Sequence, residues 1–193
     1  MFRAVRSGQN YSRALARQFY TELIAAHELG VPVAEAAARE YAPEALADGL
    51  RRVLQPDGGT VTATAIGRAL QLGGKHVQDS GRRSMLSAVL RDERLSGWAR
   101  ADPKPPTCAF CLMLISRGPV YSSRSTAGGS NRWHIGCSCQ PVPVVRGDWP
   151  GRNQYEDADR LWRDAAGESR SDPVNAFRRK LGQQQLPAAA ETA

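Results

Sequence analysis

Apolar residues recur at helical spacing through the first half of the chain. The first segment carries an apolar residue at every fourth position, and we expect four side chains to face the core: Tyr11, Leu15, Phe19 and Leu23. Pro43 opens a second predicted helix. A third spans residues 62–98. The Gly73 and Gly74 pair is expected to break or bend it, because glycine costs about 1 kcal/mol relative to alanine in a helix interior.

The pattern changes after residue 101. Residues 102–106 read Asp-Pro-Lys-Pro-Pro, which cannot continue a helix. Two helices return after residue 151, and Asp172 followed by Pro173 is typical of a helix start. We therefore divide the chain into a helical N-terminal domain (1–100), a cysteine-bearing segment (101–150), C-terminal helices (151–182) and a flexible tail (183–193).

Composition narrows the class of protein. Hydrophobic residues make up 41% and charged residues 23% of the 193 positions, which is typical of a globular chain. No apolar run approaches the roughly 20 residues of a transmembrane helix, and the N-terminus lacks the apolar region of a secretory signal. We therefore expect no membrane contact and no export. In a reducing compartment the four cysteines are expected to be metal ligands rather than disulfides.

All four cysteines fall in one short window. Cys108 and Cys111 form a CxxC pair, and His134, Cys137 and Cys139 form a later HxxCxC run. A CxxC turn directs two thiolates to one point, and a second loop completes a tetrahedron around Zn²⁺. Five candidates compete for four positions. Cys108, Cys111, His134 and Cys139 are favoured, and an all-cysteine site with His134 outside it is the alternative.

The spacing argues for a structural rather than a chemical use of the metal. A redox CxxC of the thioredoxin kind would lie in a βαβ pattern, which the sequence lacks. A zinc deaminase would carry His-x-Glu before its cysteine pair, whereas His134 follows the pair. A closed four-ligand site leaves no position for catalytic water. We therefore expect one structural Zn²⁺ and a mainly α fold with a small zinc-stabilised α+β insert, made of a short helix and a β-hairpin.

The cysteine segment resembles the MuF-like minor capsid (head morphogenesis) proteins of tailed phages. The resemblance rests on the CxxC pair, the Trp-His-x-x-Cys-x-Cys run from Trp133 and the proline-rich strand after it, and it covers residues 80–182. Residues 161–162 and 175–179 resemble the actinobacteriophage branch, whose members are sometimes labelled capsid maturation proteases. The resemblance implies a low-copy protein inside the capsid near the portal, with roles in head assembly and genome delivery. It also implies contacts with the portal or the major capsid protein, and passage through the host cytoplasm during assembly.

Charge adds an expectation about partners. The net charge is +7, and residues 51–100 carry nine basic and four acidic groups. Such a band suits packaged double-stranded DNA or an acidic protein surface, and a solvated helix face is the alternative. The expected contacts are Arg68, Lys75, Arg82, Arg83, Arg91 and Arg94.

Two rival functions come from other classes. A capsid maturation protease would recruit His76 and Ser80, with Asp79 beside them, but one helical face rarely supplies a nucleophile, a base and an orienting group. We therefore expect no enzymatic activity. A zinc-containing DNA-binding module would instead bind free duplex DNA with a steep salt dependence.

Overall fold

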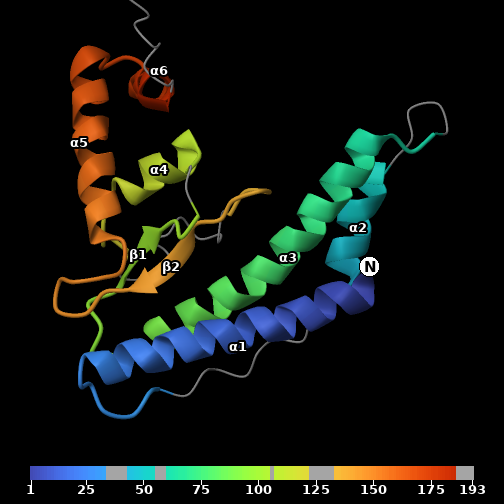
Figure 1. Ribbon diagram of the computed structural model, residues 1–193, viewed down its shortest axis with the longest axis horizontal. Helices are drawn as coiled ribbons and strands as arrows, with labels where there is room; N and C mark the ends of the chain where they lie inside the picture. Colours follow the sequence, from blue (N-terminus) through green and yellow to red (C-terminus); the bar gives the residue numbers. More distant parts are fainter. Residues whose placement is uncertain (34–42, 55–59, 105–106, 122–132, 186–193) are drawn as a thin grey trace, which may run out of the picture.

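The computed structural model describes residues 1–33, 43–54, 60–104, 107–121 and 133–185. This part of the chain forms six helices and one two-stranded sheet, which confirms the mainly helical prediction (Figure 1). None of the described helices is long and apolar enough to cross a bilayer. The elements are α1 (Phe2–Ala26), α2 (Pro43–Leu54), α3 (Ala63–Val89), β1 (Trp98–Ala101), α4 (Ala109–Ile115), β2 (Gln140–Pro143), α5 (Arg152–Glu168) and α6 (Pro173–Gln185).

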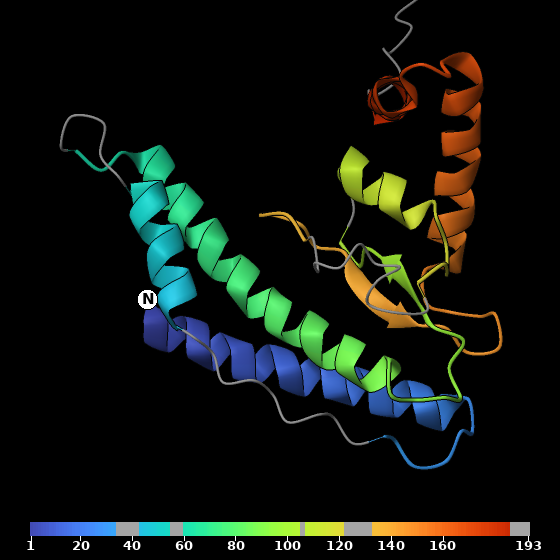
Figure 2. The same ribbon diagram turned by 180° about the vertical axis from the view of Figure 1, so that it is seen from behind.

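Helices α1 and α3 pack side by side and run in the same direction (Figures 1 and 2). Small residues let the two backbones approach closely. A Cβ atom at Gly81 would lie 2.8 Å from the carbonyl oxygen of Ser12, and one at Gly8 would lie 2.8 Å from a Val77 methyl carbon. This pair, the helical platform, positions the rest of the fold, because both α2 and β2 contact α3.

The face of α1 that enters the core differs from the predicted one. Leu23 is buried as expected, together with Tyr20 and Ile24. Three of the four predicted core residues are exposed, so that prediction was wrong for Tyr11, Leu15 and Phe19. The reason is the close approach of α3, which requires small residues such as Gly8 and Ser12 on the contacting side of α1.

Helix α3 is unbroken from Ala63 to Val89, so the predicted interruption at Gly73 and Gly74 was also wrong. Gly73 is buried beneath the start of the chain. A Cβ atom there would lie 3.0 Å from the terminal methyl carbon of Met1 and 3.5 Å from a methyl carbon of Val5. Packing of α3 against α1 and α2 offsets the helix-propensity cost of about 1 kcal/mol for each glycine.

Strands β1 and β2 pair antiparallel, with Trp98 opposite Pro143 and Arg100 opposite Pro141. Residues 102–139 separate the two strands, so the predicted local hairpin was wrong and the sheet is a long-range pair. The short helix expected in this segment is α4. The predicted domain boundary between residues 100 and 101 falls inside β1.

The two faces of β1 contribute to different hydrophobic cores. Trp98 packs in one core with Ile24 of α1 and with Cys139. Its neighbour Ala99 belongs to a second core with Trp149, as expected where successive side chains of a strand point to opposite faces. The first core therefore joins the helical platform directly to the cysteine segment.

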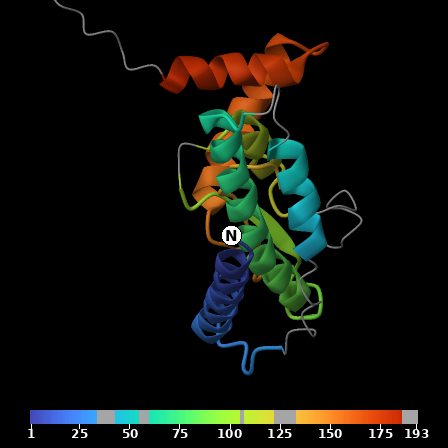
Figure 3. The same ribbon diagram turned by 90° about the vertical axis from the view of Figure 1, so that its right-hand side faces the viewer.

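Helices α5 and α6 pack against each other and against α4, on the side of the sheet away from α1 (Figure 3). Phe177 and Leu161 are buried between them. The predicted cap is present, because the backbone N–H of Asn175 donates to Asp172 Oδ1 at 3.3 Å. Helix α6 continues to Gln185, and the rest of the predicted tail, residues 186–193, lies outside the described part of the chain.

Candidate metal centre

The CxxC motif forms the start of helix α4. The Sγ of Cys108 accepts a hydrogen bond from the backbone N–H of Cys111 at 3.4 Å, as an N-cap side chain does. This geometry brings both sulfurs to the first turn of the helix. Cys108 is exposed there, whereas Cys111 is buried.

Cys137 and Cys139, just before β2, bring their sulfurs to that of Cys111. The Sγ of Cys111 lies 3.1 Å from that of Cys137 and 3.3 Å from that of Cys139, and the last two are 2.8 Å apart. All three are buried, and none forms a disulfide. Two distant segments of the chain thus place three free sulfurs at one point.

His134 joins this cluster to Cys108. Its Nε2 lies 3.4 Å from the Sγ of Cys108, and its Nδ1 lies 3.7 Å from the Sγ of Cys111. The structure therefore brings all five predicted ligands together, as two triplets that share Cys111. Within each triplet the donor atoms lie within 4.8 Å of one another.

The donor set is the one that Zn²⁺ prefers, namely thiolate sulfur with imidazole nitrogen available. Side-chain hydrogen bonds from Cys111 and Cys139 lower the pKa of Cys137 to about 2. The hydrogen bond with Cys137 raises the pKa of Cys111 above its ordinary value. The arrangement thus favours a thiolate among the buried sulfurs, and a thiolate is the form of cysteine that binds metal.

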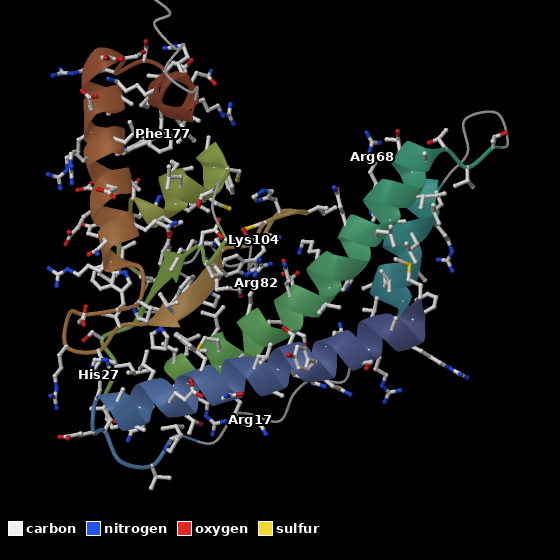
Figure 4. The ribbon with its side chains drawn as sticks, viewed as in Figure 1. Arg17, His27, Arg68, Arg82, Lys104 and Phe177 are labelled. Carbon is white, nitrogen blue, oxygen red and sulfur yellow. The ribbon has the colours of Figure 1, made fainter. Side chains whose placement is uncertain are left out.

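Arg82 belongs to this centre and not to a basic surface. Its buried guanidinium donates to the carbonyl oxygens of Cys137 at 2.6 Å and Cys139 at 3.1 Å, and it pairs with Asp79 at 2.9 Å. The prediction that Arg82 contacts DNA or a partner was therefore wrong, because the side chain is inaccessible. Figure 4 shows Arg82 reaching from α3 toward the sheet, far from Arg68 near the start of the helix.

A second buried arginine, which sequence reasoning missed, lies beside the cluster. The guanidinium carbon of Arg100 is 3.9 Å from the centroid of the Trp133 ring, and that of Arg82 is 4.5 Å from the same centroid. Nη1 of Arg100 donates to the Sγ of Cys139 at 3.8 Å. The available signal was its position in the strand, since Arg100 comes two residues after Trp98 and shares its face.

The other predicted contact residues are spread along α3 and the turn after it. Lys75 pairs with Asp79. Arg94 pairs with Asp92 at 2.7 Å and donates to the carbonyl oxygen of Leu29. The remaining three are exposed: Arg68, Arg83 and Arg91. Arg94 is exposed as well, so the structure leaves four of the six predicted residues turned toward solvent.

Comparison with known proteins finds relatives among phage proteins. A family model described as VG15 protein matches residues 1–165. The Gene 15 protein of Mycobacterium phage D29 is 33% identical over 55% of this chain and 56% of the relative, and that of Mycobacterium phage L5 is 30% identical over 58% and 56%. The match thus spans about half the length of these relatives. No solved structure matches the chain.

Proposed function

Because the chain belongs to the VG15 protein family, we propose that it is a minor capsid protein of a tailed phage. In this proposal it passes through the host cytoplasm during assembly and lies inside the finished capsid near the portal. It contributes to head morphogenesis as a structural component and catalyses no reaction. The phage origin of the relatives supports this role, as does the resemblance of the cysteine segment to MuF-like proteins.

The observation that carries the proposal is the position of the cysteine cluster in the fold. Cys111, Cys137 and Cys139 belong to the same hydrophobic core as Tyr20 and Ile24 of α1. One Zn²⁺ would be held there by buried thiolates, with the remaining ligands drawn from the Cys108 and His134 side of the cluster. The metal would supply folding free energy and join the cysteine segment to the helical platform.

A structural role is also supported by the surroundings of Ser80 and His76. Asp79, the carboxylate next to Ser80 in the sequence, pairs through one oxygen with Arg82 and through the other with Lys75. A serine nucleophile needs a base that a third group orients. Since both oxygens of Asp79 are engaged by cations, we do not assign it that role.

The exposed arginines supply the partner surface of this proposal. Arg68, Arg83 and Arg91 would contact packaged double-stranded DNA or an acidic face of the portal or major capsid protein. In a plot of log affinity against log salt concentration, each phosphate contact contributes about −0.9 to the slope. Three contacts therefore predict a slope near −3. Weak binding to free duplex together with salt-sensitive binding to purified portal would favour the protein partner.

Mass spectrometry of purified virions tests the location. The protein is expected in full heads at low copy number. It is expected in heads that have ejected their DNA only if it remains bound to the shell. Its absence from purified heads would contradict a capsid role.

Elemental analysis of the purified chain tests the metal. We expect one zinc per chain, lost in Cys111→Ser, together with new protease cleavage within residues 107–145. Ser116→Ala, at a buried hydroxyl of α4's end outside the cluster, is the matched control and should keep its zinc. A wild-type chain that contains no zinc, but in which residues 107–145 still resist protease, would refute the structural metal.

A further inference from the structure

Arg100 is a buried cation with no carboxylate partner in the described part of the chain. It is 3% exposed, and its Nε has no hydrogen-bond partner among the described residues. The segment 122–132, which joins Tyr121 to Trp133, contains no Asp or Glu. A guanidinium stays charged in proteins, and a buried charge is strongly destabilising unless an anion balances it.

The anion within reach of Arg100 is the cysteine cluster. Its Nη1 donates to the Sγ of Cys139 at 3.8 Å. Its other close neighbours are aromatic rings, with Trp133 at 3.9 Å and both Trp98 and Tyr121 at 5.8 Å from ring centroid to guanidinium carbon. A ring face attracts a cation but carries no net charge. Among the described residues, the balancing charge can therefore come only from thiolates.

Arg82 places a second buried cation over the same Trp133 ring. Its carboxylate partner Asp79 is shared with Lys75, so these three side chains carry one net positive charge. Together with Arg100, the described residues around the cluster carry two positive charges. Zn²⁺ with four thiolates has a charge of −2, whereas Zn²⁺ with three thiolates and one neutral imidazole has −1. Only the first set balances the arginines.

We propose that Arg82 and Arg100 are the counter-ions of the metal centre and that they select a four-thiolate ligand set: Cys108, Cys111, Cys137 and Cys139. His134 then lies outside the set, as the hydrogen-bond partner of the Cys108 sulfur 3.4 Å away. Partners of this kind orient ligands and tune a metal site without touching the ion. The inference rests on the zinc site of the proposed function and names its ligands and its positioning residues.

The ligand set is tested on the full chain loaded with Co²⁺, whose sulfur-to-metal charge-transfer absorption grows with each bound thiolate and whose visible d–d bands shift when a nitrogen ligand is gained or lost. His134→Ala should leave the d–d bands unchanged, and Cys108→Ser should lower the charge-transfer absorption by about a quarter, since one of four thiolates is lost. Shifted d–d bands in His134→Ala, or an unchanged charge-transfer absorption in Cys108→Ser, would overturn the four-thiolate set while leaving the zinc site intact. A wild-type chain that binds neither Co²⁺ nor Zn²⁺ would overturn the zinc site itself.

The counter-ion role is tested by Zn²⁺ competition against a chromophoric chelator. Arg100→Met should raise the dissociation constant for Zn²⁺ by roughly 10- to 100-fold, the usual effect of removing such a partner. Arg152→Met is the matched control, because Arg152 also lies over a tryptophan ring, at 5.9 Å from Trp149, but it is exposed and belongs to α5.

Arg100→Lys keeps the charge and should recover most of the affinity. Far-UV circular dichroism establishes that each variant is folded, and the Co²⁺ spectra of the His134 and Cys108 variants decide the ligand set even if Arg100→Met does not fold. Equal Zn²⁺ affinity in folded Arg100→Met and in wild type would overturn the counter-ion role.

Discussion

Arg82 donates a hydrogen bond of 2.6 Å to the carbonyl oxygen of Cys137, 55 residues further along the chain. With the companion bond to the carbonyl oxygen of Cys139, it fastens the backbone of the cysteine segment to α3. The β1–β2 pairing provides a second attachment. The segment is therefore held by protein contacts as well as by any metal bound within it.

Replacing Arg82 should destabilise the fold far more than replacing its neighbour. Arg82→Met leaves the carbonyl oxygens of Cys137 and Cys139 without this donor, and we expect a loss of roughly 2–3 kcal/mol in the free energy of unfolding. Arg83→Met, at the next and exposed position of α3, should change it by less than about 0.5 kcal/mol. Urea unfolding of the two variants measures the difference, and equal midpoints would contradict the role of Arg82.

Two glycines of α3 should respond to alanine in opposite directions. A Cβ at Gly81 would meet the Ser12 backbone, so Gly81→Ala should push α1 and α3 apart and cost roughly 1–3 kcal/mol. A Cβ at Gly74 meets no atom within 4 Å, so Gly74→Ala should stabilise the helix by about 0.5–1 kcal/mol. Thermal unfolding distinguishes them, and stabilisation by both would show that the two helices do not approach as described.

Tyr20 should ionise late in an alkaline titration. Burial raises the pKa of Tyr20 above its ordinary value of 10.0, and its hydrogen bond to the Asp92 carboxylate raises it further. Only the folded state has the raised pKa. The contribution of protonated Tyr20 to the free energy of unfolding is therefore complete below pH 10 and is lost as the pH rises through the folded pKa. Tyrosinate absorbance should therefore show a component above pH 10 that is missing in Tyr20→Phe.

Asp92→Asn provides the matching test of this pair. Removing the carboxylate charge should move the Tyr20 component down toward pH 10, while burial keeps part of the shift. An unchanged midpoint in Asp92→Asn would mean that the carboxylate does not act on Tyr20.

Substitutions on α1 should separate its buried face from its apolar exposed face. Ile24→Ala removes a fully buried side chain and should cost roughly 2–5 kcal/mol. Leu15→Ser, at a side chain that is 46% exposed, should change the free energy of unfolding by less than about 0.5 kcal/mol. A large loss for Leu15→Ser would place the core on the side that apolar spacing predicted.

Spacing rules predicted the helices and the CxxC turn because both depend on nearby residues, whereas the convergence of the two cysteine segments was predicted from the ligand preference of Zn²⁺. The CxxC pair is one turn of α4, and its geometry follows from the motif itself. The buried face of α1 was missed because apolar spacing favours large side chains, while contact with α3 depends on small ones such as Gly8 and Ser12.

Long-range partners were the other source of error. Strand β1 has only four residues and pairs with a strand far along the chain, so no local pattern indicates it. The sequence places Arg82 among the surface charges and gives no indication that Arg100 is buried, because arginine is rarely buried without a partner. Their partners, the carbonyl oxygens and sulfurs of the cysteine segment, become apparent only once the chain is folded.

Pro141 and Pro143 determine which backbone donors the outer side of β2 can present. The N–H of Val144 donates to the carbonyl oxygen of Gly97, before β1, at 3.0 Å. Backbone N–H groups of successive strand residues point to opposite sides, so positions 141 and 143 face away from β1. Proline has no N–H there. The outer side of β2 thus lacks the regular series of N–H donors that a strand from another molecule would need for pairing.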